Sequence, residues 1–138
     1  MDIIEIPFIK KLGITRTSDG QFTLAMRPDL QNHLQTLHAS AQFALAEAAS
    51  GEILQTLYPQ LVGKVVPVLR ASHIKFKKPA SQDVFSCAAV SDEALAKFDQ
   101  QFANKGRALI TVDVELKDTD GVVTCSGSYD WFVQGIEA

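Results

Sequence analysis

The stretch from His38 to Tyr58 constrains the fold more than any other part of the chain. Small or apolar residues, alanine foremost, occupy nearly every side of a helical projection of this stretch. A helix without a polar face belongs in a protein interior. Glu47 is the only charged residue between His38 and Gly51. The sequence therefore predicts one central helix, covered by the rest of the chain, with a single acid inside it.

Most of the remaining chain has the pattern of short β-strands. Asp19-Gly20 suits a tight hairpin turn, and residues 110–117 alternate apolar with polar side chains, as a half-buried strand does. Residues 91–104 have the serine cap and the Lys-Gly ending of a surface helix. An antiparallel sheet wrapped around one apolar helix accommodates this order, so we expect a single α+β domain over residues 1–138. The predicted strands are residues 14–18, 22–26, 65–76, 84–90, 110–117 and 122–132, and a short helix precedes them at residues 4–12.

Length and charge narrow the class of protein. At 138 residues the chain fits one packed domain, and its net charge of −3 gives no electrostatic case for binding nucleic acid. No apolar run is long enough to span a membrane, and the acidic start gives no sign of a secretory leader. Cys87 and Cys125 lie in apolar runs, where reduced thiols are expected, and His33 and His73 lack metal-ligand spacing. We expect a cytoplasmic protein without a metal or a resident cofactor.

Glu47 is the residue that demands an explanation. Burial disfavours the ionised form of a carboxylate, so the group needs a partner, a water molecule or a chemical role. Two structural explanations are open: Glu47 reaches the helix surface through a gap, or it pairs with an arginine such as Arg70. Catalysis is the third, because carboxylates with perturbed pKa values gather at active sites.

The chain carries a motif with fixed offsets: Asn32 lies six positions before His38, and Glu47 lies nine positions after His38. The set resembles that of the hotdog-fold acyl-CoA thioesterases related to the phenylacetate-pathway enzymes and to 4-hydroxybenzoyl-CoA thioesterase. Their motif has an Asn or Gln, a His-Gly-Gly and an Asp or Glu nine residues after that His. The run Ile74–Ala80 is similar to the strand end that these families place beside the active site. The inserted helix at 91–104 resembles an uncharacterised branch of the superfamily.

The resemblance implies a hotdog fold and a role for each motif residue. Glu47 would act as general base on water or as a nucleophile towards the thioester, and the backbone N–H of Ala39 would bind the thioester oxygen. Asn32 would orient the carbonyl or the water. His38 would shape the turn that starts the helix, or donate to the substrate.

The match departs from the family pattern at three positions. The family has two glycines where this chain has Ala39 and Ser40. The family also has a Ser or Thr on the following strand, and that position falls near Leu69, whose side chain cannot hydrogen-bond. A backbone N–H is available from alanine as well as from glycine, so Ala39 can still bind the oxygen. The supporting hydroxyl is missing or comes from another residue.

Cations near the strand end suggest how coenzyme A would be held. Lys75, Lys77 and Lys78, followed by Pro79, could meet its phosphates, and Arg107 has a weaker claim. A solvated strand end is the alternative explanation for these lysines. The expected substrate is a thioester of coenzyme A or of an acyl-carrier protein, so coenzyme A enters only as part of the substrate.

Spacing along the helix ties the proposed chemistry to assembly. Ala39 and Glu47 are separated by about 12 Å along a helix axis, so they cannot both touch one thioester carbonyl from the same helix. Two antiparallel helices in a symmetric dimer would bring the N–H of one subunit to the acid of the other, twice. We therefore expect a homodimer or a tetramer, and the family is known for that dimer.

Two other functions remain open. Hotdog dehydratases of β-hydroxyacyl thioesters use a His with a Glu on the partner's helix, and His33 precedes Glu47 at a compatible distance, although Leu34-Gln35 follows it instead of their Phe-Pro. The departures at Ala39, Ser40 and Leu69 also fit a protein that binds acyl thioesters without hydrolysing them.

Overall fold

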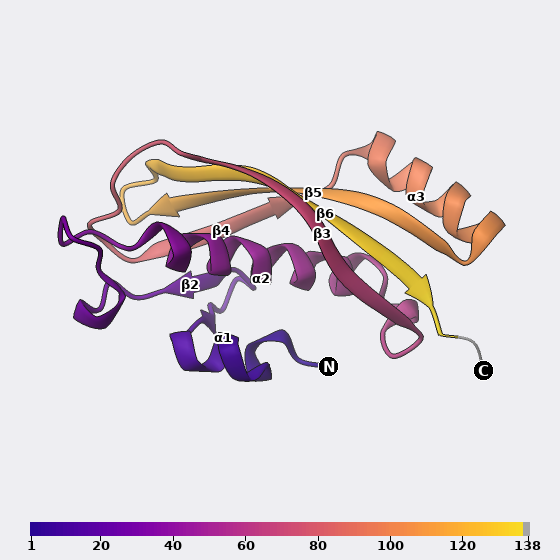
Figure 1. The fold of residues 1–138 in the computed structure, drawn as a ribbon, viewed down its shortest axis with the longest axis horizontal. Coiled ribbons are helices and arrows are strands. Elements are labelled where there is room, and N and C mark those ends of the chain that lie inside the picture. The colour runs from indigo at the N-terminus through magenta and orange to yellow at the C-terminus, as the bar shows by residue number, and fades with distance from the viewer. Residues whose placement is uncertain (137–138) are drawn as a thin grey trace.

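The computed structural model describes residues 1–136 and has a six-stranded antiparallel sheet as its framework (Figure 1). The strand order is β1-β2-β4-β5-β6-β3. The long strands β5 and β6 pair along their whole length, and β3 pairs with β6 at one edge. The strands are β1 Thr15–Arg16, β2 Phe22–Leu24, β3 Val65–Phe76, β4 Val84–Ala89, β5 Arg107–Asp118 and β6 Val123–Gly135.

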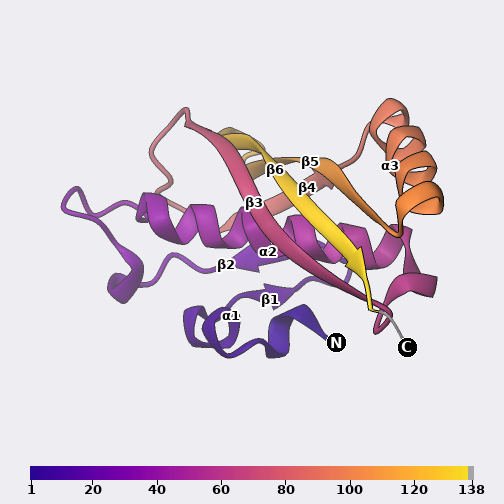
Figure 2. The same ribbon diagram turned by 45° about the vertical axis from the view of Figure 1, so that its right-hand side comes forward.

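Helix α2 (Ala39–Leu57) lies along one face of this sheet (Figure 2). On its other side it contacts α1 (Pro7–Leu12) and the 3-10 turn Ile3–Glu5, so protein covers it from both directions. Ala44, Leu45 and Ala48 are among its buried residues. The predicted α+β class, an antiparallel sheet around one long apolar helix, is confirmed.

Helix α3 (Asp92–Lys105) covers the far end of the same face. Ser91 caps its start, and Gly106 ends it in the left-handed conformation at φ 69°. Phe98 of α3 packs with Ala108 and Ile110 of β5 in a second small core. The sequence prediction for this helix is therefore confirmed.

Several predicted boundaries are wrong. Strand β5 begins at Arg107 instead of residue 110, and β6 extends to Gly135, because the two strands continue to pair as far as Arg107 and Gln134. The predicted helix at 4–12 divides at Pro7, which starts α1 after a separate 3-10 turn. The first two strands are shorter than predicted. Further 3-10 turns occur at Pro28–Leu30 and Pro59–Leu61.

Strand β3 is an open edge. It pairs with β6 on one side only, and most of its side chains are exposed on both faces of the sheet. A bulge between Leu69 and Ala71 shifts its register. Within residues 1–136, no helix has the length and apolar character that crossing a membrane requires.

Candidate functional site

Glu47 lies half-buried near the middle of α2, between the buried residues Ala46 and Ala48. Burial raises the pKa of its carboxyl above the ordinary value. Its side chain makes no hydrogen bond or ion pair with any residue in the described range 1–136. The cost of burying the acid is therefore not offset by a partner within the chain.

The side of α2 that carries Glu47 faces β6 and the open edge. Phe43 stands one helical turn before Glu47 and so shares its side, and its ring lies 5.4 Å from that of Tyr129 on β6. The hydroxyl of Tyr129 has a raised pKa because it is buried and because Cys125 and Glu47 lie nearby. Glu47 thus lies on the side of α2 that faces β6.

Two aromatic side chains of β6 fix the turn of α2 that carries Glu47. The Tyr129 hydroxyl donates to the carbonyl oxygen of Phe43 at 3.0 Å. The Trp131 indole Nε1–H donates to Ser50 Oγ at 2.8 Å, and Ser50 Oγ donates to the carbonyl oxygen of Glu47 at 2.6 Å. Sequence reasoning did not find this support. Its signal is a pair of aromatic residues with polar atoms two positions apart on one strand, the buried Tyr129 and the half-buried Trp131.

The start of α2 offers free backbone donors. His38 caps the helix, because its Nδ1 accepts the N–H of Ser40 at 2.9 Å. The N–H of Ala39 has no acceptor among the residues that the structure describes, and Ala39 is exposed. A cavity of about 300 Å³ adjoins this end and has apolar walls from Phe8 and Leu12. The arrangement can place a carbonyl oxygen at a helix N-terminus, with an apolar group beside it.

Asn32 organises the loop that leads into α2. Its Oδ1 accepts the N–H groups of Leu34 at 2.9 Å and Thr36 at 3.1 Å, and its Nδ2 donates to Thr36 Oγ1 at 2.9 Å. One Nδ2–H remains for another acceptor. His33 is exposed in the same loop.

The bulge in β3 decides which side chains of this strand face α2. Leu69 pairs with Trp131, and beyond the bulge Ser72 pairs with Tyr129, so both lie on the helix side of the sheet. Ser72 therefore supplies a hydroxyl on the strand where Leu69 cannot. The guanidinium of Arg70 lies 4.2 Å from the centre of the Phe132 ring, so the suggested pair between Arg70 and Glu47 is not formed.

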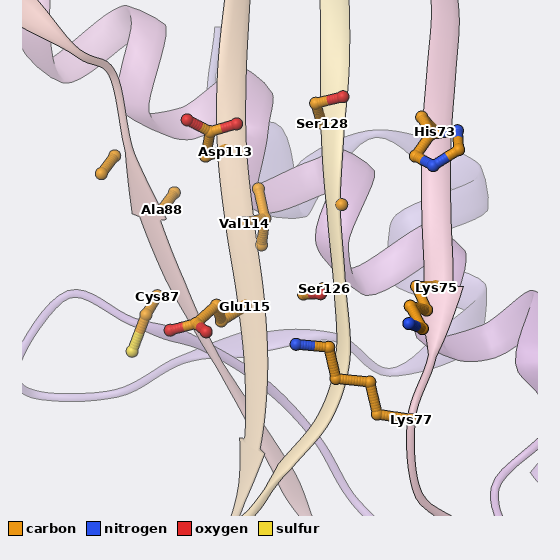
Figure 3. A pocket seen from close by; sticks show the side chains of 12 residues that line it. His73, Lys75, Lys77, Cys87, Ala88, Asp113, Val114, Glu115, Ser126 and Ser128 are labelled. Carbon is orange, nitrogen blue, oxygen red and sulfur yellow. The ribbon is translucent and has the colours of Figure 1, made fainter.

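The residues expected to hold coenzyme A do not gather at one place. The N–H of Leu37, just before α2, donates to the carbonyl oxygen of Ala80 at 2.8 Å, which brings Lys78 and Pro79 close to the helix start. Lys77 lines the opposite, outer face of the sheet (Figure 3). Arg107 begins β5 at the other end, roughly 30 Å along the strand from the level of Lys77, so the two cannot hold one diphosphate within a chain.

The cysteines and the possible metal ligands add no further candidate for chemistry at Glu47. Cys125 is buried, and burial raises the pKa of its thiol to about 11, which keeps it protonated and unreactive. Cys87 is also a free thiol. Across residues 1–136 no three His, Cys, Asp or Glu side chains group in a way that could hold a metal ion.

Comparison with known proteins places the chain in a family. The family model described as "Domain of unknown function (DUF4442)" matches residues 7–133. This chain belongs to the DUF4442 family. No curated protein sequence matches it.

Solved structures similar to this DUF4442 chain share its fold. A Pseudomonas aeruginosa protein of unknown function, described as a probable thioesterase, is 19% identical with a TM-score of 0.82, over 97% of this chain and 91% of that one. The PaaI protein of the Escherichia coli phenylacetic acid degradation operon is 17% identical with a TM-score of 0.71, over 97% and 87%. The BH2602 protein of Bacillus halodurans, solved with CoA, is 18% identical with a TM-score of 0.69, over 96% and 85%. The predicted hotdog fold is confirmed, and the likeness to proteins described as thioesterases is a likeness of fold.

Proposed function

We propose that this protein hydrolyses acyl thioesters, acyl-CoA foremost, with Glu47 as its catalytic carboxylate. One observation carries the proposal: a half-buried acid with a raised pKa and no partner within residues 1–136, on a helix turn held by two hydrogen bonds from β6. A carboxyl group whose pKa is raised towards neutrality is suited to take a proton from water. The similar fold of a probable thioesterase supports this class of reaction.

The proposed active site is shared by two copies of the chain. Ala39 and Glu47 of one helix are about 12 Å apart along its axis, so one carbonyl cannot meet both. Long exposed edge strands are normally covered, and β3 is such an edge, next to the strand β6 that lies near Glu47. A homodimer across this edge, in which Glu47 of one copy meets Ala39 of the other, satisfies both requirements.

The residues would then act in sequence. The N–H of Ala39 binds the thioester oxygen as negative charge develops on it, and the free Nδ2–H of Asn32 orients the carbonyl or the water. Glu47 removes a proton from the attacking water, or attacks the carbonyl itself to form an anhydride that water then cleaves. His38 holds the turn, and Ser72 is placed to take the role of the absent strand hydroxyl at Leu69.

Coenzyme A would enter as the thiol part of the substrate. Lys78 and Pro79 lie near the helix start, so Lys78 is the best placed cation for its phosphates, with Lys77 and Arg107 as weaker candidates. The structure of the Bacillus halodurans protein with CoA supports this carrier; an acyl-carrier protein presents the same thioester. Free thiols fit a cytoplasmic enzyme.

The test is release of free thiol from a panel of acyl-CoA thioesters. We expect Glu47→Gln to lower turnover by about 10²- to 10⁴-fold, the usual contribution of a general base. Glu52→Gln is the matched control, because Glu52 lies on the same helix but is paired with Arg16 at 2.7 Å. Full activity in Glu47→Gln would overturn the proposal. Coenzyme A binding without thiol release would favour a non-catalytic binding protein. Dehydration of a β-hydroxyacyl-CoA, lost to a greater extent in His33→Ala than in Asn32→Ala, would favour a dehydratase.

A further inference from the structure

The cavity of about 300 Å³ beside the start of α2 is built from three parts of the chain. Leu30 of the 3-10 turn and Ala41 of α2 line it and are 9% and 6% exposed, so they form an apolar floor. One wall is the side of α1 that carries Phe8 and Leu12, which are four positions apart and therefore neighbours on the helix surface. The remaining lining residues are polar, Asp29 and Ser40 among them.

Arg27 fixes the α1 wall in place. Its Nη1 donates to the carbonyl oxygen of Leu12 at 2.9 Å, and its Nε and Nη2 donate to the carboxylate of Asp29 at 3.1 and 3.3 Å. Gly13 ends α1 in the left-handed conformation at φ 76°, and a side chain there would collide with the Arg27 guanidinium. One cation thus joins the end of α1 to another lining segment of the cavity, so the short helix is a held wall and not a loose end.

The cavity adjoins the proposed oxyanion donor. Ala39, whose N–H has no acceptor within residues 1–136, lies between two lining residues, His38 and Ser40. Ser40 stands seven positions before Glu47, about two helical turns, so the two share one side of α2. A thioester oxygen bound at the Ala39 N–H therefore leaves the attached acyl group within reach of the cavity.

We propose that this cavity binds the acyl group of the substrate and that the α1 wall makes the protein selective for short, uncharged acyl groups. The inference rests on the proposed thioester hydrolysis at Glu47. Ligand pockets span about 300 to 1,000 Å³, so this one is at the small end. It has room for about ten groups of the size of a water molecule, at about 30 Å³ each. A chain of roughly ten carbons or fewer fills it, and a longer chain must leave it.

The polarity of the lining excludes charged acyl groups. The lining includes the Asp29 carboxylate and neither lysine nor arginine. A carboxylate at the end of the acyl group would lose its hydration there and meet a like charge. An apolar chain instead covers the Phe8 ring, which is 59% exposed in the absence of substrate. Burial of that ring and of the chain provides the selectivity.

The test is kcat/KM for thiol release from straight-chain acyl-CoA thioesters, acetyl to palmitoyl. We expect a rise of up to about fourfold per methylene while the cavity fills, carried mainly by KM, and no further rise beyond about ten carbons. Glutaryl-CoA, which is of similar length to pentanoyl-CoA but carries a terminal carboxylate, should be at least about tenfold poorer.

Two changes in the wall should alter this profile in different ways. Phe8→Ala removes the exposed ring, so the ratio of octanoyl to acetyl kcat/KM should fall by about tenfold. Leu12→Phe narrows the cavity, so the rise should stop at a shorter chain. Leu57→Ala is the control, because Leu57 is a half-exposed leucine at the opposite end of α2, and it should keep the wild-type profile. Thermal unfolding verifies that each variant is folded.

A wild-type kcat/KM that does not change from acetyl to octanoyl would overturn the proposal, and so would an unchanged profile in both Phe8→Ala and Leu12→Phe. S-alkyl thioethers of coenzyme A, which have no carbonyl to hydrolyse, separate this failure from that of the proposed function. If the wild type releases no thiol from any substrate, the proposed hydrolysis is wrong. Calorimetric affinity for the thioethers should still rise with chain length and lose that rise in Phe8→Ala; equal affinity at all lengths would refute the pocket itself.

Discussion

A buried hydrogen bond between α2 and β6 provides a quantitative test of how the helix is held on the sheet. The Thr124 hydroxyl donates to Gln42 Oε1 at 2.9 Å, and the two residues are 0% and 3% exposed. Thr124→Val keeps the volume of the side chain and removes only the donor. It therefore leaves the Gln42 amide oxygen buried without this partner.

The expected cost follows from that geometry. A buried polar group that loses its partner costs about 1–3 kcal/mol, more than the net worth of the hydrogen bond itself. The volume is conserved, so no cavity term adds to it. For a chain of this length the melting temperature should fall by roughly 3–12 °C. Gln42→Leu combined with Thr124→Val should cost less than the two single changes added together, by at least about 0.5 kcal/mol, because both polar partners are gone.

Urea unfolding at one fixed protein concentration is the appropriate assay, since any assembly adds to apparent stability. Thr56→Val is the control: Thr56 is exposed on the same helix, and its hydroxyl donates to the Glu52 carbonyl oxygen at 3.1 Å. We expect a change within about 0.5 kcal/mol for this control. An equally small change for Thr124→Val, or strict additivity in the double variant, would show that this contact does not hold the helix.

Two further predictions concern the turn of Glu47. The raised pKa means that the folded chain binds the Glu47 proton more tightly than the unfolded chain, so wild-type stability falls as the pH rises from the ordinary value of 4.5 through the raised one. Glu47→Gln should therefore be the more stable protein at pH 8, with no advantage below about pH 4; urea midpoints that differ equally at both pH values would contradict this. Trp131→Phe removes the donor to Ser50, worth about 1 kcal/mol. If the indole positions Glu47, this variant should lower kcat for thiol release severalfold and leave KM unchanged. Ser50→Ala should have the same effect. A change in KM alone would argue for a merely structural role.

Local patterns in the sequence were sufficient to predict the layers of the fold. A helix that has no polar face can only be central, and the stretch around Glu47 is such a helix. Strict alternation on β5 identified which side chains are buried, as the exposed Asp113 and the buried Val114 illustrate. The cap at Ser91 and the glycine at 106 defined α3. These features depend on neighbours in the sequence, and for that reason a single chain reveals them.

The contents of the site depended on contacts between distant segments, which local patterns do not encode. A bulge after Leu69 turns Ser72 towards the helix, and nothing in the letters of β3 marks it. The same register sends Lys77 to the outer face, away from Lys78. The bonds from Tyr129 and Trp131 to α2 span more than eighty positions. Only the pairing of β6 with its neighbours makes them visible.

Under the proposed mechanism, the position of Glu47 means that a single copy of the chain would lack a complete active site. Its helix turn is fixed from β6 at Phe43 and at Ser50, so the acid has a defined place but no partner within residues 1–136. The free N–H groups at Ala39 lie on the same rigid helix, and no motion of α2 as a unit can bring them to it. Whatever completes the site must approach from the side of the open edge β3.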